Sequence, residues 1–135
     1  MIAIIDSGGA NIASVTFALE RCGATGTLTT DAEMIASADK VILPGVGAAP
    51  VAMAQLQKAG LVDCIRGLTQ PVLGICLGMQ LLFERSEEGD TALLGLIPGT
   101  VGAFQPAPGL SIPHMGWNQL LPTNGAAANP LLKGI

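Results

Sequence analysis

One cysteine stands where the chain changes from one hydrophobic period to another. Residues 71–75 form a short apolar run bounded by proline, the pattern of a strand buried on both faces. From residue 77 to residue 84, apolar side chains recur at helical spacing among good helix formers. Cys76 lies between the two segments, so the sequence predicts a strand that turns into a helix at this residue.

Glycines lie two residues before and two residues after this cysteine, at Gly74 and Gly78. This is the spacing of a nucleophile elbow, with cysteine in place of serine. In such a sharp turn larger flanking side chains would collide, and the nucleophile has a strained backbone. The Leu77 N–H, at the start of the helix, can face an oxyanion. The alternative is that Cys76 is a small core residue, as most free cysteines are.

A glycine-rich loop, Pro44-Gly45-Val46-Gly47, follows another apolar run at residues 40–43. Open α/β sheets bind their ligands at the carboxyl ends of strands, where this loop falls. Because glycine lets the backbone approach closely, we expect the N–H of Val46 or Gly47 to be a second oxyanion donor. The alternative is a simple turn without a chemical role.

The rest of the chain alternates between apolar runs and helical patterns. This order is typical of an open, mostly parallel, doubly wound α/β sheet with helices on both faces. Apolar segments at residues 96–104 and 110–121, broken by Pro and Gly, indicate strands of a partly antiparallel extension. With 135 residues and 50% hydrophobic content, we expect one domain over residues 1–135. The expected strands are residues 1–5, 26–29, 40–43 and 71–75. The expected helices are residues 11–22, 50–59 and 61–68. Two further helices are expected, one that is capped by Thr30 or Asp31 and one that follows Cys76.

Composition argues against several classes of function. The net charge is −4 and the few Lys and Arg residues do not cluster, which disfavours a nucleic-acid partner. The uncharged residues 91–113 contain too much Pro and Gly for a membrane helix. A single His and the lack of a close Cys pair leave no metal-ligand cluster. Three cysteines and no secretory signal predict a cytoplasmic protein in which Cys22 and Cys64 are packing residues.

Two other local patterns have simple interpretations. The turn at residues 7–10 follows the first expected strand, but it lacks the full glycine spacing of a dinucleotide-binding fingerprint. The dense charge cluster at residues 84–90 is interpreted as a solvated helix end and loop. Neither pattern predicts a site of its own.

Three segments together resemble one family. They are Gly-Ile-Cys-Leu-Gly-Met-Gln at 74–80, Pro-Gly-Val-Gly at 44–47 and Pro-His-Met-Gly-Trp-Asn at 113–118. The first is shared by class I glutamine amidotransferases, and the third resembles their branch of glutaminase subunits of imidazole glycerol phosphate synthase. The resemblance implies hydrolysis of L-glutamine through a Cys76 thioester, without a cofactor or metal. It also implies transfer of the ammonia to a (β/α)8 cyclase subunit, which forms imidazole glycerol phosphate and aminoimidazole carboxamide ribotide in histidine biosynthesis.

The resemblance also implies roles for individual residues. The residues around the glutamine would be Gly45, Gly47 and Gln80, with Glu88 facing its ammonium. The surface that docks the cyclase in a heterodimer would include Asn11, Pro113, His114, Met115 and Trp117, although Met and Trp are more often core residues. In this family a peptide group of the 44–47 loop would reorient before its N–H donates to the oxyanion, which would let the partner control activity.

A dyad of Cys76 with His114, the only histidine, is the alternative assignment of the general base. Because His114 falls in the docking motif, we do not predict that it is catalytic.

In the resembling family the catalytic His and Glu lie further along the chain than Ile135. We therefore expect these 135 residues alone to be alkylated at Cys76, to expose apolar surface and not to turn over glutamine efficiently. Two alternatives remain open. Another Cys-elbow enzyme, such as a thiol hydrolase or a stress protein of similar fold, would have no reason to carry the 113–118 segment. A non-catalytic interaction domain would tolerate Cys76→Ser without a chemical consequence.

Overall fold

The computed structural model describes residues 1–119 of the chain. Two compact units divide the chain, Met1–Ala103 and Phe104–Ile135. The first unit contains every helix and strand in the described residues. Whether residues 1–135 form one domain stays a prediction.

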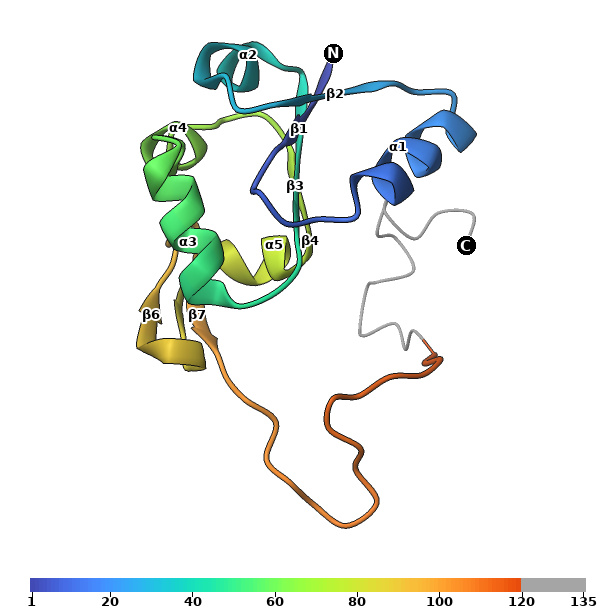
Figure 1. Ribbon diagram of the computed structural model, residues 1–135, viewed down its shortest axis with the longest axis vertical. Helices are drawn as coiled ribbons and strands as arrows, with labels where there is room; N and C mark the ends of the chain where they lie inside the picture. Colours follow the sequence, from blue (N-terminus) through green and yellow to red (C-terminus); the bar gives the residue numbers. More distant parts are fainter. Residues whose placement is uncertain (120–135) are drawn as a thin grey trace. The chain divides into compact units, whose positions relative to one another are not determined.

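The first unit is built on four parallel strands. They are β1 (Ile2–Ile5), β2 (Gly26–Thr29), β3 (Lys40–Gly45) and β4 (Val72–Cys76), in the spatial order β2-β1-β3-β4 (Figure 1). Because β1 pairs with both β2 and β3, the chain starts inside the sheet and winds outward in two directions. The structure confirms the predicted α/β fold with a parallel, doubly wound sheet.

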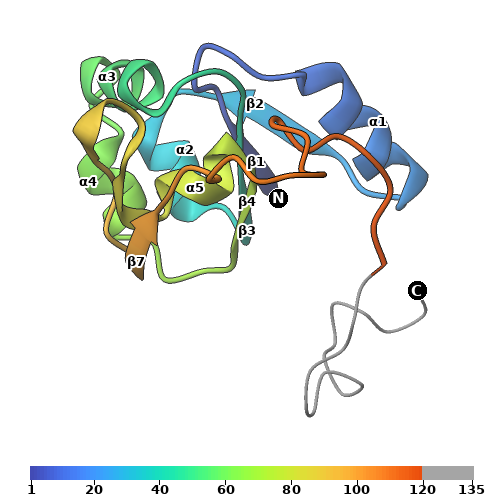
Figure 2. The same cartoon turned by 90° about the horizontal axis from the view of Figure 1, so that it is seen from below.

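Five α-helices accompany these strands in residues 1–119. They are α1 (Ile12–Arg21), α2 (Ala32–Ser37), α3 (Ala49–Lys58), α4 (Val62–Arg66) and α5 (Leu77–Leu81). Figures 1 and 2 both show α1 on one face of the sheet and the other four helices on the opposite face. Asp31 caps α2, as predicted, by accepting the Glu33 and Met34 N–H groups at 2.8 and 3.2 Å. None of the helices in residues 1–119 is long and apolar enough to span a membrane.

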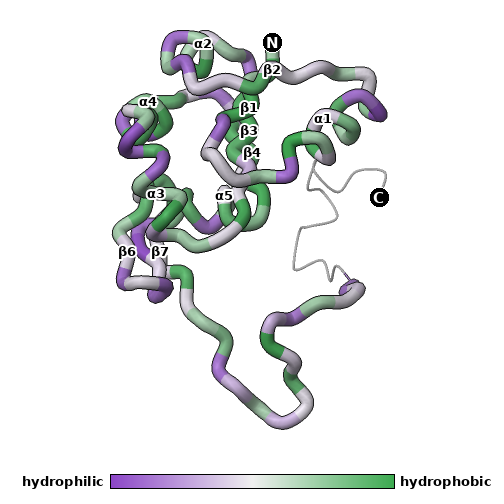
Figure 3. The backbone as a smooth tube through the Cα atoms, viewed as in Figure 1, coloured by the Kyte–Doolittle hydropathy of each residue, from purple (hydrophilic) through white to green (hydrophobic). Residues whose placement is uncertain are grey.

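The hydrophobic core lies on the face that carries α2 to α5. Alternate sheet residues point into it because successive strand side chains face opposite sides. Each fully buried Leu or Ile there contributes about 1.5–3 kcal/mol to folding. Figure 3 shows hydrophobic residues along β1, β3 and β4. The main core residues are Ala3, Ile5, Val41 and Leu43 from the sheet, and Ile35, Leu56, Ile65 and Leu81 from the helices.

The other face of β4 is not buried in this chain. Leu73 and Ile75 are 55% and 38% exposed, so the expectation of a strand buried on both faces was wrong. The physical reason is the position of α1, the helix on this face of the sheet. It contributes no buried residue, and its Leu19 lies beside Ile4 of β1 and Gly26 of β2, which leaves Leu73 and Ile75 of β4 exposed. The expected exposure of apolar surface is therefore found here, on the side of the sheet away from the core.

The helix after Cys76 is shorter than predicted. It ends at Leu81, and Phe83–Ser86 forms β5, which pairs antiparallel with β6 (Thr91–Ala92) and parallel with β7 (Ile97–Val101). The Leu82 carbonyl accepts the N–H groups of residues 96 and 97, so pairing with distant chain overrides the local helical pattern. The charge cluster at 84–90 is correspondingly a strand followed by a 3₁₀ turn, η1 (Glu88–Asp90), not a helix end.

The predicted partly antiparallel extension is present as this second sheet, in the order β6-β5-β7. Its strand β7 falls within the expected 96–104 segment. No strand forms between residues 110 and 119, where a further one was expected, and residues 120–121 of that expectation lie outside the described part. Pro113 and Gly116 in this stretch are poor strand residues, which accounts for the difference.

Candidate active site

Cys76 is the last residue of β4 and the N-cap of α5. Its backbone has φ 55° and ψ −118°, a conformation that costs a non-glycine residue about 1–3 kcal/mol. In the ladder between β3 and β4 it is the partner of Gly45, and its side chain is exposed. The structure therefore confirms the predicted hinge and excludes the alternative of a buried core cysteine.

The glycines around the cysteine are required by close backbone contacts. A Cβ at Gly74 would lie 2.5 Å from the Met79 Cα, and a Cβ at Gly78 would lie 1.8 Å from the Leu43 carbonyl oxygen. A Cβ at Gly45 would lie 2.9 Å from the Gly78 nitrogen. These distances confirm that larger residues would collide at the elbow.

The strain at the elbow gives a stability prediction. Cys76→Gly is expected to be about 1–2 kcal/mol more stable than Cys76→Ala, because relief of about 1–3 kcal/mol of strain exceeds the entropy cost of glycine, about 0.5–1 kcal/mol. Both variants lack the thiol, so only the backbone preference differs between them. Urea denaturation of the two proteins measures the difference. Equal free energies of unfolding would show that the Cys76 conformation carries no strain.

The Pro44–Gly47 loop is held by the turn after β1. The Ser7 hydroxyl donates to the Pro44 carbonyl at 3.0 Å, and the Val46 N–H donates to the Gly9 carbonyl at 2.9 Å. The Val46 N–H is thus occupied and cannot donate to an oxyanion in this conformation. β3 also continues two residues further than predicted, through Gly45, so only the end of the loop leaves the sheet.

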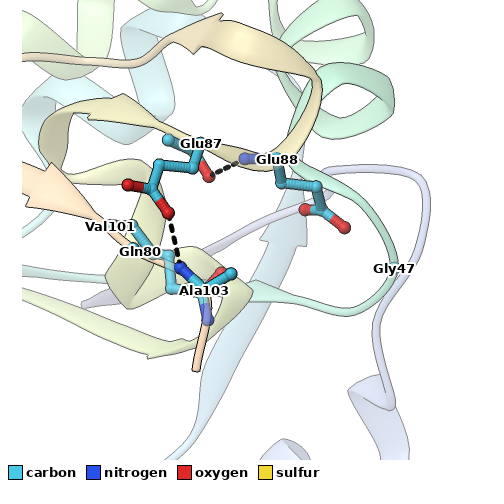
Figure 4. A pocket seen from close by; sticks show the side chains of 8 residues that line it. Gly47, Gln80, Glu87, Glu88, Val101 and Ala103 are labelled. Carbon is cyan, nitrogen blue, oxygen red and sulfur yellow. Dashed lines mark hydrogen bonds between the residues drawn. The ribbon is translucent and has the colours of Figure 1, made fainter. Parts of the chain in front are cut away.

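A pocket of about 430 Å³ lies between this loop, α5 and the second sheet (Figure 4). Three of the four predicted substrate residues, Gly47, Gln80 and Glu88, line it together. Gly45 and Cys76 are not in its lining, and Cys76 lies one helical turn before Gln80. The other lining residues are Ser86, Glu87, Val101, Gly102 and Ala103.

The acidic residues at this pocket accept backbone N–H groups. The Glu88 carboxylate accepts the Ala49 N–H at 2.8 Å, and the Glu87 carboxylate accepts the Ala103 N–H at 2.8 Å. The buried Ser86 hydroxyl accepts the Glu88 N–H at 3.1 Å. Sequence reasoning missed Ser86 and Glu87, and the only signal for them was their position beside Glu88.

The other two cysteines differ from Cys76 in their surroundings. Cys64 packs against the core and its thiol donates to the Ala32 carbonyl at 3.5 Å; burial raises the pKa of this thiol, so it stays protonated at neutral pH. Cys22 is the exposed C-cap of α1, so the expectation that it packs inside was wrong. Within residues 1–119, no three His, Cys, Asp or Glu side chains gather as metal ligands would.

The residues assigned to partner docking are exposed. Asn11 caps α1, where its side-chain oxygen accepts the Ser14 N–H at 3.2 Å. Pro113, His114, Met115 and Trp117 belong to the second unit, and Met115 and Trp117 are 86% and 102% exposed, so neither is a core residue. The Asn118 side-chain amide donates to the His114 Nε2 at 2.9 Å. A docking role for these residues stays a prediction, as does the exclusion of His114 from catalysis.

Comparison with known proteins agrees with this geometry. Residues 3–134 match the family described as glutamine amidotransferase class-I, and the chain belongs to this family. It is 57% identical to the imidazole glycerol phosphate synthase subunit HisH of Xanthomonas axonopodis pv. citri (strain 306), and 55% identical to that of Xylella fastidiosa (strain Temecula1), in each case over 134 residues. These alignments cover 99% of this chain, which spans 66% of the length of the relatives. The alternative of a thiol hydrolase or stress protein is not favoured by these matches.

Proposed function

We propose that this protein hydrolyses L-glutamine to glutamate and ammonia through a thioester on Cys76. The observation that carries the proposal is the exposed thiol on a strained elbow, paired with Gly45 at the carboxyl edge of a parallel sheet. The pocket lined by Gln80 and Glu88 begins one helical turn away, and it provides polar groups for a small amino acid. The likeness to glutaminase subunits supports the choice of substrate.

The reaction uses the elbow as follows. The Cys76 thiolate attacks the side-chain amide carbon, so a sulfur–carbon bond forms and the carbonyl oxygen becomes an oxyanion. The Leu77 N–H, which as a first helical donor has no acceptor within the helix, stabilises that oxyanion. The carbon–nitrogen bond then breaks and the nitrogen leaves with an added proton as ammonia. Water, activated by a general base, hydrolyses the thioester, which releases glutamate and returns the thiol.

The second oxyanion donor has to come from the Pro44–Gly47 loop. Of the two predicted donors, Val46 and Gly47, the Val46 N–H becomes available only when it leaves the Gly9 carbonyl, so we expect slow turnover through this donor until the loop reorients. The Gly9 turn is followed directly by Asn11, one of the residues proposed to face the partner. Docking at that turn would therefore act on the bond that holds the loop.

We propose that the partner is a (β/α)8 cyclase that receives the ammonia and forms imidazole glycerol phosphate in histidine biosynthesis. The relatives are named as subunits of imidazole glycerol phosphate synthase, which supports this assignment. Exposed Trp and Met in an uncharged segment are typical anchors of a protein interface. The proposed docking surface comprises Asn11, Pro113, His114, Met115 and Trp117.

Glutamate release by the complete encoded protein, with and without the cyclase subunit, tests the proposal. We expect the cyclase to raise the rate by about 10-fold or more, within the usual range of coupling between sites. Trp117→Ala is expected to reduce this stimulation and to leave the rate of the isolated subunit unchanged. Absence of glutamate release in both conditions would refute the proposed activity. A rate of glutamate release that does not change when the cyclase is added would refute the proposed partner.

A further inference from the structure

Helix α3 begins directly after the Pro44–Gly47 loop, but its own sequence does not cap it. Its N-cap is Ala48, which has no side-chain acceptor, and Ala49 is buried. A buried N–H at the start of a helix needs an acceptor from elsewhere. The Glu88 carboxylate, 39 residues further along the chain, supplies it by accepting the Ala49 N–H at 2.8 Å. A charged acceptor at a helix N-terminus is also favoured by the helix dipole.

The η1 turn is built to hold Glu88 in this position. The buried Ser86 hydroxyl accepts the Glu88 N–H at 3.1 Å, and the Thr91 hydroxyl donates to the Glu88 carbonyl at 2.8 Å. Gly89 has φ 64° and lies against the start of α3, where a Cβ would be 2.5 Å from the Pro50 Cγ. Figure 4 shows the Glu88 side chain directed toward the ribbon that carries Gly47. Backbone and side chain of this turn therefore dock together on the first turn of α3.

We infer that Glu88 is a positioning residue for the oxyanion loop, a role additional to contact with the substrate; this inference rests on the proposed function. Ala49 is only two residues after Gly47, so a fixed first turn of α3 restricts the backbone of residues 46–48, which must present an N–H to the oxyanion. The bond to Ala49 uses one carboxylate oxygen, and the other remains available to a ligand in the pocket. The Glu88 side chain would therefore contact both the substrate in the pocket and the first turn of α3, which directly follows the oxyanion loop.

Two substitutions separate positioning from substrate binding in the complete protein with its cyclase. Glu88→Gln keeps an oxygen that can accept the Ala49 N–H but removes the charge, whereas Glu88→Ala removes both. We expect kcat to fall about 10- to 100-fold in Glu88→Ala and to stay within about 3-fold of wild type in Glu88→Gln, whose KM rises instead. If Glu88 only bound the substrate ammonium, both variants would raise KM and neither would lower kcat, which would overturn the inference. Glu88→Asp keeps the charge without the reach, so its kcat should also fall.

The backbone amide signal of Gly47 gives a readout that does not depend on turnover. In NMR spectra without glutamine, we expect this signal to shift in Glu88→Ala and to remain near its wild-type position in Glu88→Gln. Glu84→Ala is the matched control, because the Glu84 carboxylate accepts the Gly99 N–H at 2.9 Å outside the pocket. It should leave both kcat and the Gly47 signal unchanged. A wild-type protein without glutaminase activity would refute the proposed function, whereas an unmoved Gly47 signal in Glu88→Ala would refute the positioning role by itself.

Discussion

Cys76→Ser is expected to lower the rate of glutamate release by about four orders of magnitude or more. The serine hydroxyl is far less acidic than a thiol, so it needs a base to remove its proton before it can attack. At the elbow it meets helix N–H groups, and no base for it has been identified within residues 1–119. The substitution keeps a Cβ of the same shape, so the backbone at φ 55° and the packing of α5 should not change. The rate of glutamate formation and the free energy of unfolding, measured on the same preparation, check both parts.

Cys22→Ser provides the control for loss of a thiol. Cys22 is exposed at the end of α1, outside the pocket and the elbow, so this variant should keep wild-type activity. If Cys76→Ser retained more than about a tenth of the activity, the thioester mechanism would be wrong. Equal losses in the two variants would point to a general effect of thiol removal on the protein.

Gly78→Ala is expected to destabilise the protein by about 4 kcal/mol or more, at the upper end of single substitutions. The new Cβ would lie 1.8 Å from the Leu43 carbonyl oxygen and 2.7 Å from its carbonyl carbon. Both contacts are with the backbone of β3, and Leu43 is fully buried, so no flexible side chain can move aside. Either α5 or β3 has to shift. Urea denaturation followed by circular dichroism measures the loss, and failure to obtain folded protein would agree with it.

Two glycines outside the elbow serve as controls for this substitution. Gly67 has φ −84° and its Cβ would lie 3.4 Å from the nearest atom, so Gly67→Ala should change stability by no more than about 0.5 kcal/mol. Gly23 has φ 69° with nothing within 4 Å, so Gly23→Ala isolates the conformational cost, about 1–2 kcal/mol. A loss in Gly78→Ala no larger than that in Gly23→Ala would contradict the argument from collision.

Elements defined by local signals were predictable from the sequence. The strand at Gly26–Thr29, the Asp31 cap and the elbow all follow from apolar runs, capping residues and glycine spacing that lie within a few residues. The strand at Phe83–Ser86 does not, because its four residues fit a helix equally well and only pairing with residues 91–101 decides the outcome. Exposure of one face of β4 likewise depends on what covers the sheet, which no local pattern contains.

In the candidate site, too, the sequence predicted the residue types but not the tertiary contacts. Cys76, Gly47 and Gln80 lie in the recognised motifs and Glu88 was implied by the family resemblance, and three of these four residues line one pocket. The bonds from Val46 to Gly9 and from Ala49 to Glu88 were not predicted, since a backbone N–H has no signature in the residue types. These bonds hold the Pro44–Gly47 loop and the start of α3 in the observed conformation. Motifs thus indicate candidate reactive groups, and tertiary structure shows how the loop beside them is held.

Reaction of the complete encoded protein with a glutamine-like chloroketone tests the central claim most directly, with the labelled cysteine identified by mass spectrometry. We expect the label to form fastest on Cys76, and to form more slowly there when glutamine is present. Cys22, which is exposed, and Cys64, whose thiol has a raised pKa, act as internal controls that glutamine should not protect. Labelling of Cys76 that glutamine does not slow, or labelling spread equally over the three cysteines, would contradict the assignment of Cys76 as the nucleophile that attacks glutamine.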